Sequence, residues 1–169
     1  MPDISWTHLW VKYIHVIGVF VFLIGHGVSA MALWRIRSER DPYALRTLLD
    51  LSARSIGVMS IGLTMWFLSG VSLGFSGNYW TTGRYWLWAS LVVAVVVIGL
   101  MTPMGAMYLN RVRAALGVDP KKRDEPADLT RVDPGLVEVA IKSGQPILVI
   151  LIGFGGIAVL AWLMMFKPF

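Results

Sequence analysis

Apolar residues dominate this 169-residue chain in four long runs that contain no charged side chain. Each run spans about 19 to 26 residues, the length that a helix needs to cross a hydrocarbon core of about 30 Å. A content of 56% hydrophobic residues is also too high for a soluble domain of this size. We therefore expect an all-α, four-transmembrane-helix bundle that forms a single integral membrane domain over residues 1–169. The four runs are Tyr13–Trp34, Gly57–Phe75, Tyr85–Asn110 and Ser143–Phe166.

Basic residues are distributed unevenly between the two sides of these runs. The segments between the first two runs and between the last two carry twelve lysines and arginines, against three elsewhere. This bias predicts that both basic segments are cytoplasmic and both termini outside, in a multi-pass protein of the bacterial inner membrane. The net charge of +5 is then explained by orientation and contact with anionic membrane lipid, so no nucleic-acid partner is expected. The twelve are Arg35, Arg37, Arg40, Arg46, Arg54, Arg111, Arg113, Lys121, Lys122, Arg123, Arg131 and Lys142; the three are Lys12, Arg84 and Lys167.

Two Asp-Pro pairs mark the starts of the second and fourth helical segments. Asp41 and Asp133 are typical N-cap residues, and the proline that follows each suits the first helical position. A polar connector, Leu116–Leu129, precedes the second pair. Because each half follows the same order of helix, Arg-x-Arg, loop, Asp-Pro and helix, the sequence also fits two parallel two-helix repeats. Small residues in the first run, Gly18 and Gly25, suit close helix packing.

All three histidines lie on one face of the first predicted helix. At ~100° per residue, measured from His8, Lys12 lies at about 40°, His15 at about −20° and His26 at about 0°. An imidazole inside a membrane span costs free energy unless it faces protein, water or a ligand. His15, His26 and Lys12 are therefore candidate cofactor-binding residues.

Haem b is the most specific cofactor that this stripe suggests. The chain has no cysteine, which excludes thiolate ligands, whereas imidazole is a common axial ligand of haem iron. We expect His15 to be the axial ligand, because Lys12 lies near enough to bind a propionate. Histidines on one helix cannot clamp one iron from both sides, so a second ligand would be Met65, another methionine or a histidine of a second subunit. The alternative is that both intramembrane histidines are structural and hydrogen-bond to neighbouring groups.

Copper is the alternative cofactor, and a methionine motif in the third run adds to its candidate ligands. Met-x-x-Met-x-x-Met, formed by Met101, Met104 and Met107, offers thioether sulfurs that suit soft Cu(I). The candidate metal ligands are thus these methionines with His15 and His26. Alternatively, the methionines fill irregular space beside Pro103.

One stretch of the first helix resembles two groups of bacterial membrane proteins. The stretch is Leu9-Trp10-Val11-Lys12-Tyr13-Ile14-His15-Val16-Ile17-Gly18-Val19-Phe20. It is similar to an uncharacterised four-helix family related to copper-resistance D-type proteins, a resemblance that implies four spans and a link to copper. It is also similar to the membrane protoporphyrinogen oxidase family, whose Lys-x-x-His is matched by Lys12 and His15. Where that family has a Pro-Arg pair and a third-helix lysine, this chain has Ala30-Met31 and, roughly, Ala89 or Ser90.

Two functional classes follow from these patterns. The first is an accessory or redox-associated subunit that uses the histidine stripe, either for haem or for copper handling. The second is a purely structural subunit of a larger membrane complex. In both classes we expect other membrane subunits or further copies of the chain as partners, and no catalytic activity of the chain alone. Signatures of serine hydrolases, zinc proteases and nucleotide-binding loops have no support in this sequence.

Overall fold

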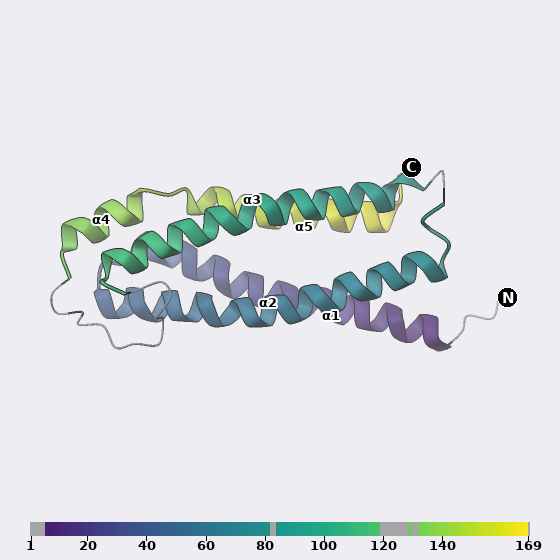
Figure 1. The fold of residues 1–169 in the computed structure, drawn as a ribbon, viewed down its shortest axis with the longest axis horizontal. Helices are drawn as coiled ribbons and strands as arrows, with labels where there is room; N and C mark the ends of the chain where they lie inside the picture. Colours follow the sequence, from purple (N-terminus) through teal and green to yellow (C-terminus); the bar gives the residue numbers. More distant parts are fainter. Residues whose placement is uncertain (1–5, 82–83, 119–128, 130–131, 169) are drawn as a thin grey trace.

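The protein is an all-α bundle, seen in a computed structural model that describes residues 6–81, 84–118, 129 and 132–168 (Figure 1). Four helical segments of 31, 35, 31 and 33 residues are long and apolar enough to cross a membrane. The predicted four-helix architecture is therefore confirmed. The helices are α1 (Trp6–Ile36), α2 (Pro42–Ser76), α3 (Tyr85–Ala115), α4 (Pro134–Lys142) and α5 (Pro146–Phe166), and α4 with α5 makes up the fourth segment.

Both predicted Asp-Pro helix starts are confirmed. The Asp41 carboxylate accepts a hydrogen bond from the Ala44 N–H (2.7 Å), and Asp133 accepts one from the Gly135 N–H (2.7 Å). These bonds satisfy N–H groups that have no partner inside the helix, which fixes where α2 and α4 begin. Most of the predicted connector Leu116–Leu129 lies outside the described residues, as do four of the predicted cytoplasmic cations, Lys121, Lys122, Arg123 and Arg131.

The first hairpin, α1 with α2, is held together by direct contact between backbones. A Cβ at Gly18 would lie 2.6 Å from the backbone nitrogen of Trp66, and one at Gly25 would lie 2.8 Å from that of Met59. Neither helix could approach this closely if these positions carried side chains. Gly18 and Gly25 thus allow the backbones of α1 and α2 to touch in the middle of the hairpin.

The second hairpin, α3 with α5, packs mainly through side chains. Gly156 of α5 faces the Val97 side chain, whose Cγ2 atom would lie 2.5 Å from a Cβ at that position. Gly105 of α3 has only Val149 nearby, at 3.7 Å. Figure 1 shows the two hairpins as two layers lying side by side along their length. We call the interface between these hairpins the seam.

One end of the bundle carries most of the described arginines, and we call it the basic end. A cluster of apolar side chains closes it, drawn from all five helices. The buried Arg113 guanidinium donates a hydrogen bond to the Leu49 carbonyl (2.9 Å), and an ion pair joins Arg40 to Glu138 of α4. The two hairpins are thereby tied at this end. The core of the cluster includes Ile36, Leu45, Leu49, Tyr108, Val112, Leu116, Val137 and Ile141.

At the opposite end lie Trp6 of α1, the α2–α3 connection and the end of α5 (Figure 1). We call this the terminal end. Many large apolar side chains on the outer faces of the helices are exposed, for example Phe20, Ile24, Val95 and Leu151. Exposing so much apolar surface to water would cost free energy, whereas contact with lipid tails would not. The outer faces thus suit a bilayer.

Candidate functional site

The histidine stripe of α1 lies on the seam, where three cavities follow one another along the bundle. The terminal cavity, of about 270 Å³, is lined by His8, Lys12 and His15 among others. The middle cavity, of about 240 Å³, has both His15 and His26 in its wall. The third cavity, of about 280 Å³, extends from His26 toward the basic end. Neighbouring cavities share wall residues, so the histidine stripe borders all three.

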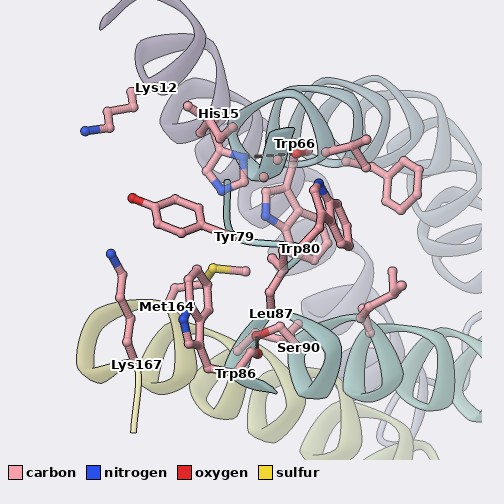
Figure 2. Close-up of a pocket in the computed structure, with 18 of the residues that line it drawn as sticks. Lys12, His15, Trp66, Tyr79, Trp80, Trp86, Leu87, Ser90, Met164 and Lys167 are labelled. Atoms are coloured by element: carbon pink, nitrogen blue, oxygen red, sulfur yellow. Dashed lines mark hydrogen bonds between the residues drawn. The ribbon is translucent and has the colours of Figure 1, made fainter. Parts of the chain in front are cut away.

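His15 is oriented by two groups of α2. Its Nδ1 atom lies 3.0 Å from the Trp66 carbonyl oxygen and 3.2 Å from the Ser69 hydroxyl. A carbonyl oxygen only accepts hydrogen bonds, so the proton must be on Nδ1 in this arrangement. The Nε2 atom then has a free lone pair, and Figure 2 shows this second nitrogen pointing into the cavity. Gly70 leaves room for the ring, because a Cβ there would lie 3.1 Å from the His15 Cε1 atom.

The terminal cavity combines an aromatic wall with a cationic rim. Trp66, Trp80 and Trp86 contribute to its wall, and Lys12 and Lys167 lie at its mouth with the Tyr79 ring between them (Figure 2). The cavity therefore offers one imidazole nitrogen, flat apolar walls and two ammonium groups. Lys167 and Tyr79 were missed by the sequence analysis. The only signal for Lys167 was that it lies on the same predicted side of the membrane as Lys12.

His26 lies deeper and is almost fully buried, with 5% of its surface exposed. Its ring stacks on Phe22 at a centroid distance of 5.7 Å and meets Phe154 of α5 at 4.8 Å. Its Nε2 atom has no hydrogen-bond partner among the described residues. An unpaired polar atom at such a site costs about 1–3 kcal/mol, so a ligand that bound it would recover free energy.

The methionine motif does not gather at one point. Met101 lies on the seam next to His26: a Cβ at Gly153 would be 2.7 Å from the His26 Nε2 atom and 2.8 Å from the Met101 Sδ atom. Met104 packs against the core of the basic end, and Met107 is 53% exposed on the outer face. Met65 packs against Gly18 and lines none of the three cavities. Within the described ranges, no three His, Cys, Asp or Glu side chains are grouped as a metal site.

His8 and Lys12 complete the stripe toward the terminal end. The His8 Nδ1 atom lies 3.1 Å from the Ser76 hydroxyl, which joins the ends of α1 and α2. Lys12 lies about one turn from His15, or ~4.5 Å along the helix axis. The candidate cofactor residues His15 and Lys12 therefore share one cavity, and His26 belongs to the next one.

No family model matches this chain, and neither the curated proteins nor the solved structures contain a match. The resemblance of the first helix to copper-resistance D-type proteins and to membrane protoporphyrinogen oxidases stays a prediction.

Proposed function

We propose that this chain is a redox-associated membrane subunit that binds one b-type haem in the terminal cavity, with His15 as the axial ligand. The observation that carries this proposal is that His15, held by a hydrogen bond from its Nδ1–H to the Trp66 carbonyl, points its second ring nitrogen into the terminal cavity (Figure 2). Such a bond holds the ring in one orientation, leaves Nε2 to bind metal and raises its basicity.

The rest of the terminal cavity suits the other parts of haem. Trp66, Trp80 and Trp86 offer flat apolar surfaces to a macrocycle, and the middle cavity adjoins for additional space. The Lys12 side chain lies at the mouth of this cavity, where its ammonium would bind a propionate of a haem held by His15. Met164 of α5 lines the same cavity across from His15 (Figure 2), so its thioether sulfur is the candidate for a second iron ligand.

The test is the absorption spectrum of the protein purified from haem-replete cells. Wild type is expected to show a Soret band that shifts on reduction with dithionite, and His15→Ala is expected to lack it. His8→Ala is the matched control, because His8 lines the same cavity on the same helix face. A colourless wild-type protein, or an unchanged band in a well-folded His15→Ala variant, would refute the proposal.

Copper handling is a second candidate, favoured by the approach of His26 and Met101. The unpaired His26 Nε2 atom and the Met101 sulfur both lie within 3 Å of the position that a Cβ at Gly153 would take, and these two kinds of donor suit Cu(I). Elemental analysis of protein purified with Cu(I) under reducing conditions tests this idea. Bound copper should be lost in Met101→Leu and retained in Met107→Leu. Equal retention in both variants would exclude the Met101 sulfur as a ligand.

We also propose that the basic end faces the cytoplasm of a bacterial inner membrane. The described arginines near Ser38 support this orientation, because such charges resist translocation. The chain has no cysteine of its own, so a thiol reagent would label only a cysteine introduced at the exposed Ser38 or Ser76. An impermeant thiol reagent added to intact cells should label Ser76→Cys and leave Ser38→Cys unlabelled. The reverse pattern would invert the topology.

A further inference from the structure

We propose that Lys12 and Lys167 form a two-point clamp for a ligand that carries two carboxylates on one edge. The inference rests on the proposed haem site and adds to it a second anchoring residue, Lys167. It also names the chemical feature that the cavity selects, which is a pair of carboxylates rather than a single negative charge.

The two lysines reach the terminal cavity from opposite hairpins. Lys12 belongs to α1, and Lys167 follows the last turn of α5. Figure 2 shows both side chains at the same mouth of the cavity, with Lys12 near His15 and Lys167 near Trp86. A ligand that contacted both would therefore bridge the seam at its terminal end. There, no apolar cluster like that of the basic end joins the hairpins within the described part of the chain.

Lys167 is held at this mouth by the local structure. Its backbone is left-handed, with φ of 45°, and its N–H donates to the Leu163 carbonyl (3.1 Å), which ends α5. A non-glycine residue adopts this conformation only where the surroundings support it. Its Nζ atom lies 5.3 Å from the ring centroids of both Tyr79 and Trp86, so two aromatic faces hold the charge beside the cavity.

These two charges have no counter-ion in the described protein. Every Asp and Glu within the described ranges is at the basic end or next to it: Glu39, Asp41, Asp50, Asp133 and Glu138. Two ammonium groups beside a cavity with apolar aromatic walls attract a ligand whose body is flat and apolar and whose edge is anionic. Haem has this form, with two propionates on one side of the macrocycle.

The test compares iron protoporphyrin as the free diacid with its dimethyl ester, titrated into apo-protein in detergent. Wild type is expected to bind the diacid more tightly. Lys12→Gln and Lys167→Gln should each weaken diacid binding about fivefold, as for an ion pair near the surface, and leave ester binding unchanged. Because esters also partition into detergent, the ratio of the two affinities is compared between proteins. Arg84→Gln is the control, since Arg84 stacks on Tyr79 but does not line the cavity.

Each outcome of this test either supports or overturns the proposed clamp. A ratio that falls in both lysine variants and stays at the wild-type value in Arg84→Gln supports it. An unchanged ratio in Lys167→Gln overturns the clamp and leaves the haem site intact, provided that the Soret shift still depends on His15. Loss of the difference on adding anionic phosphatidylglycerol would assign the lysines to lipid and overturn it as well. If neither porphyrin gives a His15-dependent Soret shift, the haem site fails and the clamp fails with it.

Discussion

The two ends of the bundle are built differently. At the basic end, side chains from all five helices fill the space, and residues such as Leu49 and Val112 have no exposed surface. At the terminal end, large aromatic side chains surround a cavity of about 270 Å³. Close packing gives stability, whereas a preformed cavity offers space for a ligand. Close packing is thus concentrated at the basic end, and the terminal end has the open space that the proposed ligand would need.

The largest expected effect on stability comes from truncating the packed end. Leu49→Ala removes a fully buried side chain and should lower the free energy of unfolding by about 2–5 kcal/mol, because the well-packed surroundings cannot collapse around the gap. Leu91→Ala at the terminal end is the matched change. Its side chain already borders the terminal cavity, so it should cost clearly less. Unfolding of both variants in mixed detergent measures the difference. An equal loss of unfolding free energy in the two variants would mean that the basic end is not more tightly packed than the terminal end.

Filling the cavity at the terminal end should affect ligand binding strongly and stability only slightly. Ala94 lies in the walls of both the terminal and the middle cavity, so Ala94→Phe places a ring where the two adjoin. We expect loss of the proposed haem Soret band, with a change in unfolding free energy of less than about 1 kcal/mol, because the ring enters existing space. Absorption and unfolding are measured on the same preparation. A variant that unfolds early and still binds haem would contradict the division between the ends.

The smallest effect concerns the turn between α1 and α2 at the basic end. The N–H groups of Arg40 and Asp41, together with the Arg35 guanidinium, hold the pKa of Glu39 below its ordinary value. A lowered pKa in the folded state adds stability above the unfolded pKa of the carboxyl group, and this contribution is lost as the pH falls through the folded pKa. Wild type should therefore lose slightly more stability in acid than Glu39→Gln does. Thermal unfolding over a pH series checks this, and parallel pH profiles would contradict it.

The fold was predictable because its signals are local. Spans show as charge-free runs, and Asp41 and Asp133 cap helices through bonds to residues two or three positions away. The histidine stripe was equally readable from helical periodicity. The partners of the stripe were not, because they depend on how helices pack against each other.

The methionines illustrate this limit. Residues three apart on a helix turn by ~300°, so Met101, Met104 and Met107 fan out rather than align. Only the packing of α3 and α5 against α1 shows that Met101 is the one beside His26. For the same reason, no sequence pattern placed Lys167 opposite Lys12, since one lies on the first helix and the other follows the last.

The terminal cavity has walls from both the first and the last helix, which sets an order of events during biosynthesis. The first hairpin can form as soon as α2 has been inserted, because its backbone contacts through Gly18 and Gly25 need no other helix. The cavity is complete only when α5 has also been inserted, since Leu160, Met164 and Lys167 contribute to its wall. A ligand that needs the complete cavity can therefore bind only after α5 has been inserted. The proposed ligand would then enter between two hairpins that have already formed.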